Sequence, residues 1–271
     1  MTEGPRIVNA DATVVLERFF ETLNASHGRA LALDYDGTLA PFQVHRNAAV
    51  PYPGVREALA GILARERTRV VLISGRVAEE VRDLLGIRPA PEIWGVHGRQ
   101  RLWPDGRTEL TPVRASDAQA LSAAAAWMGK SGYAERAEYK PGSVAVHWRG
   151  VAEDQVEDTR RTIRAALRPI ADGARMSLLE FDGGIELRAA EPNKGTAVSA
   201  LLKELEPGTP LAFLGDDTTD EDAFVALRGT RALTVLVRPQ WRETAATVWI
   251  RPPEELLGFL HAWAEQGGGG R

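Results

Sequence analysis

The stretch LALDYDGTLAPF, residues 31–42, starts as an apolar strand and ends in two carboxylates. Asp34 follows a short apolar run, Asp36 lies two positions further on, and Gly37 and Thr38 favour a tight turn directly after them. Ligands of open parallel sheets bind outside the carboxyl ends of the strands. The stretch therefore predicts a buried strand with a polar site at its carboxyl end.

Composition narrows the class of protein. The chain has 271 residues, of which 44% are apolar and 26% charged, as in globular proteins with a sizeable core. A net charge of −4 gives no electrostatic reason to expect nucleic acid or an anionic membrane as a partner. Cysteine is absent, which excludes disulfides and cysteine nucleophiles. No leader-like start and no apolar run of about 20 residues are present, so we expect a cytoplasmic protein. The sequence does not determine the oligomeric state, and a monomer is compatible with it.

Near-continuous apolar runs alternate with helical patterns over most of the chain. The runs lie at Ala30–Tyr35, Arg69–Ile73, Glu92–Val96, Leu211–Gly215, Leu233–Val237 and Thr247–Ile250. The helical patterns lie at Thr13–Leu23, Pro53–Glu66, Val77–Leu85, Lys194–Leu205, Asp220–Leu227 and Pro253–Ala264. Strands that are apolar along their whole length are typical of a parallel sheet covered on both faces. The sequence therefore predicts a doubly wound, mostly parallel α/β core formed by residues 1–110 and 190–271.

Residues 111–189 follow a different pattern, in which two helices alternate with two hairpins. The helices are predicted at Asp117–Gly129 and Val156–Ile170, and the hairpins at Tyr133–Arg149 and Arg175–Ala189. Pro-Gly and Asp-Gly-Gly turns mark the two hairpins. This order predicts an inserted α+β domain with an open antiparallel sheet and helices on one face.

Acidic residues follow two of the predicted core strands. Asp34 ends one strand, Asp216 ends another in LAFLGDDTTDED, and Ser74 follows a third. Two carboxylates about 4 Å apart repel by roughly 4 kcal/mol at an effective dielectric constant of about 20. Further negative charge comes from Asp36, Asp217 and Asp220. A hard divalent cation would relieve the repulsion, and a site with few oxygen ligands and retained waters suits Mg²⁺.

A calcium loop of the EF-hand type is excluded at both acidic segments. Such a loop needs glycine at its sixth position and glutamate at its twelfth. The loop that would start at Asp34 has neither residue, and the one that would start at Asp216 has a glutamate where glycine is needed. Asp220 is also predicted to cap the helix that follows it.

Basic residues lie where an anion could bind. Lys194 begins a predicted helix, where the macrodipole favours negative charge. Arg76 follows Ser74 on the carboxyl side of a predicted strand. Together with a cation and the amides after Asp34, Lys194 and Ser74 predict a cradle for a phosphate group.

Four segments resemble, in chain order, the motifs of the haloacid-dehalogenase-like phosphatases. They are DYDGT at 34–38, the strand with SGR at 70–76, PNKG around Lys194 and GDDTTDED at 215–222. The last segment, with GVHG at 95–98, resembles the trehalose-6-phosphate phosphatase family in particular. The resemblance implies a small-molecule substrate, trehalose 6-phosphate, a role in trehalose biosynthesis, and an inserted domain that acts as a cap.

The resemblance also implies a role for each matching residue. Asp34 is the expected nucleophile, which forms an aspartyl-phosphate, and Asp36 is the expected general acid and then general base. Mg²⁺ is expected to bind Asp34, the backbone carbonyl of Asp36 and Asp216. Ser74 and Lys194 are expected to bind the phosphoryl oxygens, and Arg76 to bind substrate. Thr38, Asp217 and Asp220 are expected to support the ligands from behind, with Asp217 or Asp220 alternatively pairing with the lysine.

Charged residues at alternate positions of the inserted strands are candidates for sugar binding. Residues two apart share a strand face, and such pairs are Glu138 and Lys140, His147 and Arg149, and Glu186 and Arg188. The resemblance assigns sugar contacts to Glu138, Lys140 and Glu186. A solvated face with cross-strand ion pairs is the alternative. His97 could contact the sugar or hydrogen-bond the wall of the site.

Two other functions are compatible with these patterns. A phosphatase of another glycosyl phosphate, such as sucrose phosphate or glucosylglycerol phosphate, would share the same core residues. A phospho-acceptor signalling module also gathers an aspartate, Mg²⁺ and a lysine at strand ends, but such modules are shorter and lack an inserted domain. Asp36 favours turnover over a stable phosphorylated state.

Overall fold

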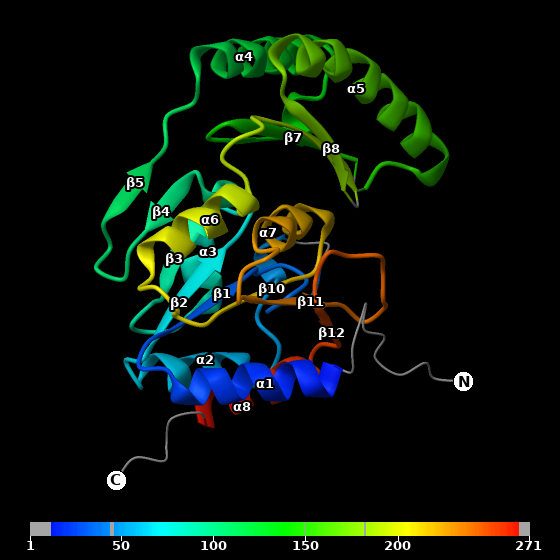
Figure 1. Cartoon of the computed structure of the whole chain (residues 1–271). Coiled ribbons are helices and arrows are strands. Elements are labelled where there is room, and N and C mark those ends of the chain that lie inside the picture. The colour runs from blue at the N-terminus through cyan, green and yellow to red at the C-terminus, as the bar shows by residue number, and fades with distance from the viewer. Residues whose placement is uncertain (1–11, 44–45, 149, 182, 266–271) are drawn as a thin grey trace. The chain divides into compact units, whose positions relative to one another are not determined.

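A computed structural model of the chain describes residues 12–43, 46–148, 150–181 and 183–265. The described chain separates into two compact units. The first comprises the described residues up to Glu109 and from Asn193 onward, and the second is the segment Leu110–Pro192. The chain enters and leaves the first unit on either side of the second, so the second unit is an insertion; in Figure 1 the first unit accordingly combines blue-to-green and yellow-to-red segments.

The first unit is built on an eight-stranded sheet. Its strands are β1 (Arg29–Leu33), β2 (Thr68–Ile73), β3 (Glu92–Gly95), β4 (Gln100–Leu102), β5 (Thr108–Leu110), β10 (Leu211–Gly215), β11 (Leu233–Val237) and β12 (Val248–Ile250). Their order across the sheet is β12-β11-β10-β1-β2-β3-β4-β5. The pairings from β12 to β3 are parallel, and β4 is antiparallel to β3. The predicted mostly parallel core is therefore confirmed.

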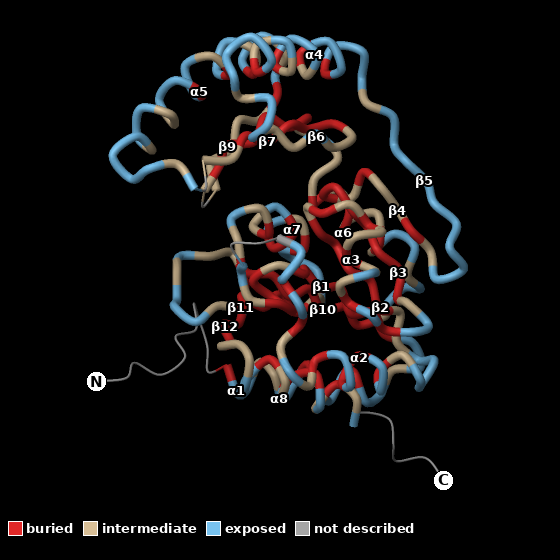
Figure 2. The backbone as a smooth tube through the Cα atoms, turned by 180° about the vertical axis from the view of Figure 1, so that it is seen from behind, coloured by how far each residue is buried: buried red, intermediate tan, exposed pale blue. Residues whose placement is uncertain are grey.

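Helices cover both faces of this sheet. They are α1 (Ala12–Ala25), α2 (Val55–Leu63), α3 (Ala78–Leu85), α6 (Lys194–Glu204), α7 (Glu221–Ala226) and α8 (Glu254–Glu265). Along β1, Leu31 and Leu33 pack in one apolar cluster with α1, α2, α3 and α8, while Ala30 and Ala32 pack in a second cluster with α6 and α7. Alternate residues of a strand point to opposite faces, which is why every residue of β1 is buried and its residues 30–33 are all apolar (Figure 2).

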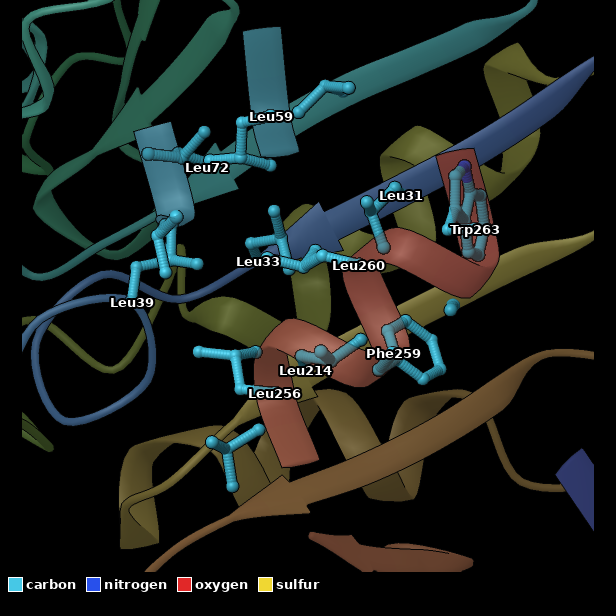
Figure 3. Close-up of a cluster of buried hydrophobic side chains, with 14 of the residues drawn as sticks. Leu31, Leu33, Leu39, Leu59, Leu72, Leu214, Leu256, Phe259, Leu260 and Trp263 are labelled. Atoms are coloured by element: carbon cyan, nitrogen blue, oxygen red, sulfur yellow. The ribbon is translucent and has the colours of Figure 1, made fainter. Parts of the chain in front are cut away.

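The first cluster shows that α1 and the C-terminal helix α8 both pack against the sheet. Figure 3 shows Leu256, Phe259, Leu260 and Trp263 of α8 beside Leu31, Leu33 and Leu214 of the sheet. On α1, the rings of Phe19 and Trp263 lie 6.0 Å apart in a tilted arrangement, so the buried residues of this helix pack on the core. Among the described residues, no helix is both long and apolar enough to cross a membrane.

Most predicted boundaries differ from the structure by a few residues, and two of the differences have a visible cause. The helix predicted from Pro53 begins at Val55, because Gly54 adopts a left-handed backbone (φ 89°) and stands at its N-cap. The strand predicted from Tyr133 begins at Ala137, because Ala134–Arg136 form a 3₁₀ turn. Tyr133 is held against the preceding helix by stacking on Trp127, with 5.4 Å between ring centroids.

The second unit is an antiparallel sheet with helices on one face. Its strands β6 (Ala137–Lys140), β7 (Ser143–His147), β8 (Ser177–Phe181) and β9 (Gly184–Arg188) lie in the order β6-β7-β9-β8. The helices α4 (Ala115–Lys130) and α5 (Glu153–Ala174) pack with Val144, Val146, Ile185 and Leu187 in one buried cluster. The intervening residues of β7 and β9 therefore face the other side, as predicted for an open sheet.

We expect Leu72→Ala in β2 to lower the free energy of unfolding by about 2–5 kcal/mol, measured by urea denaturation. Leu72 is fully buried in the cluster of Figure 3, and the truncation would leave a cavity beside Leu33 and Leu59. Val14→Ala is the control, since Val14 is 39% exposed on α1 and its loss should change the unfolding free energy by less than about 0.5 kcal/mol. Equal losses in the two variants would contradict the assigned core.

Candidate active site

The order of the strands brings three predicted site residues to one edge of the sheet. β1 is central, with β10 on one side and β2 on the other. Asp34, Asp216 and Ser74 directly follow these three strands. The Asp34 amide donates to the Leu214 carbonyl at 2.9 Å, which continues the parallel pairing up to the site. This is the point where the chain winds to either side of β1, the usual position of a ligand site in such sheets.

The turn after Asp36 passes directly beside Asp216. Gly37 has a left-handed backbone (φ 82°), and a Cβ at this position would lie 2.1 Å from a carboxylate oxygen of Asp216. Only glycine meets both requirements, which explains the Gly37 of the opening motif. Thr38 is buried, and its hydroxyl donates to Oδ1 of Asp216 at 3.4 Å. Thr38, which was predicted to support the site, therefore contacts Asp216, a predicted metal ligand.

Lys194 is buried between two carboxylates. Its Nζ lies 2.8 Å from Oδ1 of Asp34 and 2.7 Å from Oδ1 of Asp220. Lys194 is the first residue of α6. Asn193, directly before it, caps the helix, because its side chain accepts a hydrogen bond from the Thr196 amide at 2.9 Å. The cap holds the start of α6 and so directs Lys194 into the cluster.

The capping role predicted for Asp220 is wrong. No side-chain hydrogen bond from Asp220 caps α7. Its Oδ2 instead accepts hydrogen bonds from the backbone amides of Asp216 and Asp217, at 3.1 and 3.0 Å. Asp217 caps the 3₁₀ turn Thr218–Asp220 in its place, with Oδ1 2.7 Å from the Thr218 amide. Both oxygens of Asp220 are therefore engaged, one with Lys194 and one with the loop that carries Asp216.

The charges of this cluster are not balanced within the cluster itself. Asp34, Asp216 and Asp220 offer carboxylate oxygens within 4.8 Å of one another, and all three residues are buried. Three carboxylates beside the one ammonium of Lys194 leave two negative charges. Burial raises the pKa of Asp34 to about 7, with Lys194 opposing and Asp220 adding to the rise. Burial, with repulsion from Asp34 and Asp220, also raises the pKa of Asp216 well above its ordinary value.

The donor set fits a divalent cation. Burial would lower the pKa of Lys194, but Asp220 and Asp34 outweigh it and raise that pKa, so the lysine stays charged. Because Asp220 is committed to Lys194 and to backbone amides, Asp34 and Asp216 are the carboxylates best placed to bind Mg²⁺. Oxygen donors and a double negative charge are what this ion requires. The same cation would keep both carboxylates ionised at neutral pH.

Arg76 holds the second aspartate of the opening motif. Its Nε and Nη2 lie 2.6 and 2.7 Å from the two carboxylate oxygens of Asp36. Its Nη1 bonds Glu80 one helical turn along α3, and the Arg76 side chain is only 5% exposed. The sequence predicted that Arg76 binds substrate; the structure places its guanidinium against Asp36 and Glu80. Glu80, four positions after Arg76, was not predicted as a site residue.

Ser74 and His97 lie where β2 and β3 end. Ser74 is buried and its Oγ accepts a hydrogen bond from the Arg76 amide at 3.2 Å, which leaves its hydroxyl proton to donate elsewhere. The His97 amide donates to the Ser74 carbonyl at 2.8 Å. Val96 and His97 both have positive φ, 50° and 56°, and the imidazole packs over Gly75. Positive φ is rare for a β-branched residue such as Val96 and is typical of strained functional segments.

Predicted sugar-binding residues share the open face of the second unit. Register places Glu138, Ala145 and Glu186 in one row across β6, β7 and β9, and Ser143 beside Arg188 in the next. Lys140 Nζ lies 3.6 Å from both Glu138 and Glu186. His147 Nε2 lies 3.1 Å from Glu138. Arg149 lies outside the described residues.

Sequence reasoning missed one residue of this face, Ser143. Its Oγ donates to Oε1 of Glu186 at 2.7 Å. Its position two residues before Ala145 and four before His147, on one strand, is a signal that could have identified it. The predicted residues of this face thus form a connected set of charged and hydroxyl groups.

The fold of this chain is that of the haloacid-dehalogenase-like hydrolases. A haloacid dehalogenase-like hydrolase from Bacteroides thetaiotaomicron has a similar structure, with a TM-score of 0.62, 13% identity and coverage of 86% of this chain and 98% of that one. The C-terminal domain of the trehalose-6-phosphate phosphatase of Candida albicans is also similar, with a TM-score of 0.76, 20% identity and coverage of 97% and 99%.

Comparison of sequences identifies the family. The trehalose-phosphatase family profile matches residues 32–247, which include every motif quoted above. The trehalose-phosphate phosphatase of Mycobacterium avium is 31% identical over 258 residues, which cover 88% of this chain and 62% of that protein. The chain belongs to the trehalose-phosphatase family. It spans about 62% of the length of this curated relative.

We expect Mg²⁺ to stabilise the protein more strongly at pH 8 than at pH 6. Asp34 has a pKa of about 7 in the folded metal-free protein against 3.8 ordinarily. The folded state thus holds a proton that the unfolded state releases, and this contribution to stability is lost as pH rises from about 4 to about 7. Mg²⁺ competes with that proton, so its dissociation constant should be about tenfold larger at pH 6 than at pH 8, measured by Mg²⁺ titration of the thermal midpoint.

Two aspartate variants control this measurement. Asp216→Asn should remove most of the Mg²⁺ response, since it takes away one of the two available carboxylates. Asp222→Asn removes the same charge from an exposed position on α7 and should keep the response. A response that is unchanged between pH 6 and pH 8, or that survives Asp216→Asn, would contradict the assigned cation site.

Proposed function

We propose that this protein is a Mg²⁺-dependent phosphatase that hydrolyses trehalose 6-phosphate to trehalose and phosphate, in trehalose biosynthesis. The observation that carries the proposal is the buried cluster of Asp34, Lys194, Asp216 and Asp220, at the strand edge where this class of fold binds ligands. Membership of the trehalose-phosphatase family supports the choice of substrate.

Asp34 is the proposed nucleophile. A carboxylate oxygen of Asp34 attacks phosphorus, and the bond from phosphorus to the sugar oxygen breaks, which leaves an aspartyl-phosphate. Lys194, 2.8 Å from Oδ1 of Asp34, fixes the orientation of the carboxylate and offers positive charge to the phosphoryl oxygens. Ser74 donates its hydroxyl proton to another of these oxygens. The cation, bound by Asp34, Asp216 and the carbonyl of Asp36, would neutralise charge on the phosphate.

Asp36 is the proposed proton donor and acceptor. It gives a proton to the departing sugar oxygen and later takes one from the water that attacks phosphorus, which returns Asp34 as a carboxylate. In the structure both oxygens of Asp36 accept hydrogen bonds from Arg76. Those bonds set the direction of the Asp36 side chain, and at least one must be given up when Asp36 carries the proton. Arg76 is therefore proposed to orient Asp36 as well as to meet the phosphate.

The second unit is proposed to recognise the sugar. Its open face presents carboxylates from Glu138 and Glu186, the ammonium of Lys140 and the imidazole of His147, with Arg188 in the neighbouring row. A disaccharide carries many hydroxyl groups, and charged groups hydrogen-bond hydroxyls strongly. Arg149 and His97 are proposed as further contacts. This arrangement supports a cap that selects the sugar, while the first unit performs the chemistry.

We expect purified protein with Mg²⁺ to release phosphate from trehalose 6-phosphate at least about tenfold faster, in kcat/KM, than from glucose 6-phosphate, a difference of about 1.4 kcal/mol. A panel with sucrose phosphate and glucosylglycerol phosphate tests the runner-up functions, since these substrates require the same core but a different sugar site. Preference for another member of the panel would replace trehalose 6-phosphate and keep the reaction. A stable phosphoprotein without turnover would favour the signalling module.

We expect Asp34→Asn to abolish turnover, with a loss of kcat of at least about 10⁴-fold, because an amide cannot form the covalent intermediate. Asp36→Asn should still accept phosphate from an activated ester with a good leaving group but should hydrolyse the phosphoenzyme slowly. The measurement is a burst of leaving group in single-turnover assays. Circular dichroism of both variants controls for folding, and retained turnover in Asp34→Asn would contradict the assigned nucleophile.

A further inference from the structure

Arg242, on the connection between β11 and β12, reaches the loop that carries Asp216. Its Nη2 donates to the Asp217 carbonyl at 2.8 Å, and its Nε and Nη2 reach the Asp216 carbonyl at 3.4 and 3.3 Å. Arg238, at the end of β11, makes one similar contact, with Nη1 3.3 Å from the Asp216 carbonyl. One planar guanidinium thus spans two consecutive carbonyls, a geometry that lysine cannot reproduce.

These contacts fix the peptide groups on both sides of Asp216. The Asp216 amide donates to Oδ2 of Asp220, while the Asp216 carbonyl accepts from Arg242. A residue whose amide and carbonyl are both held has little freedom in φ and ψ, and its Cα–Cβ direction is set. The Asp216 carboxylate is accordingly directed at Gly37, close to Asp34. Arg242 therefore acts on the orientation of a proposed metal ligand without touching the carboxylate.

Arg242 is itself held in place. Its Nη1 pairs with Oε1 of Glu221 at 2.5 Å, and donates to the Glu243 carbonyl at 2.9 Å. Glu221 also accepts from the Thr244 hydroxyl at 2.8 Å and from the Ala245 amide at 2.7 Å. The Arg242 side chain is 21% exposed. Glu221 opens α7, directly after the 3₁₀ turn of the site, so the pair ties the connection from β11 to β12 against the acidic loop.

We propose that Arg242, held by Glu221, is a positioning residue that sets the affinity of the site for its divalent cation. This inference rests on the Mg²⁺ site of the proposed function, and it does not depend on which sugar phosphate is the substrate. Removal of a group that orients a metal ligand without touching the metal commonly weakens metal binding by about 10–100-fold. The energy comes from preorganisation, since a carboxylate that is already aimed loses less freedom when the metal binds.

The test compares Mg²⁺ binding by Arg242→Lys and the unmodified protein, with Mg²⁺ as the only ligand. Isothermal titration and Mg²⁺ titration of the thermal midpoint should both show a dissociation constant about tenfold larger in the variant. Arg242→Lys keeps the positive charge but loses the planar fork, so the change reports orientation rather than charge. At saturating Mg²⁺ the kcat should return to within about threefold of the original, because the carboxylate is then held by the ion.

The matched control is Arg238→Lys. Arg238 donates once to the same carbonyl, so its replacement should change the dissociation constant by less than about threefold. Glu221→Gln is the second variant, which leaves Arg242 in place but weakens its anchor. It should weaken Mg²⁺ binding in the same direction, and combining it with Arg242→Lys should weaken binding by less than the product of the two effects, since both act through one unit.

Three outcomes would overturn the inference. The first is that Arg242→Lys binds Mg²⁺ as tightly as the original protein. The second is that Arg238→Lys loses as much Mg²⁺ affinity as Arg242→Lys does. The third is that Arg242→Lys lowers the thermal midpoint of the metal-free protein and leaves the Mg²⁺ affinity unchanged, which a purely structural role would produce. If Arg242→Lys fails to fold, unchanged Mg²⁺ affinity in Glu221→Gln overturns it instead. Failure of the proposed function is distinguishable, because it would appear as normal Mg²⁺ binding without turnover of trehalose 6-phosphate.

Discussion

The burial of three carboxylates beside a single lysine is the constraint on which the rest of the structure depends. Asp34, Asp216 and Asp220 lie within one small cluster, and Lys194 compensates only one of their charges. Such a cluster costs free energy unless each oxygen has a partner. The protein meets this requirement partly with Lys194 and with backbone amides directed at Asp220. The remaining charge is what prepares the site for a cation and for a phosphate group.

Several features of the chain hold this cluster in place. The parallel pairing of β1 with β10 brings Asp34 beside Asp216, and the glycine after Asp36 allows the turn to pass against the Asp216 carboxylate. The capped start of α6 directs Lys194 inward. Arginine side chains then hold two further parts of the site, Arg76 the Asp36 side chain and Arg242 the acidic loop. Val96 and His97, beside Ser74, adopt positive φ values, which are unfavourable for residues other than glycine.

The candidate residues for chemistry and those for sugar binding belong to separate units of the chain. The acidic cluster belongs wholly to the first unit, whose sheet is buried on both faces. The second unit covers only one face of its sheet with α4 and α5, and the candidate sugar-binding residues Glu138, Lys140 and Glu186 lie on the other. A sheet face without helices can change its side chains at little cost to the core. This separation agrees with the proposal that the insertion selects the sugar while the first unit performs the reaction.

The amino-acid sequence by itself determined the layered α/β core, the insertion and the position of each acidic residue at a strand end. These features depend on local periodicity and on spacing within a motif, which a single segment carries. Only the tertiary structure decided which groups meet. Thr38 contacts Asp216 across 178 residues of chain, Asp36 pairs with Arg76 across 40, and Arg242 reaches Asp217 across 25. For Asp220 the sequence left two roles open, a helix cap and a partner of the lysine, and the tertiary structure decided for Lys194 and two backbone amides. Contacts of this kind depend on the order of strands in the sheet, and no local pattern encodes that order.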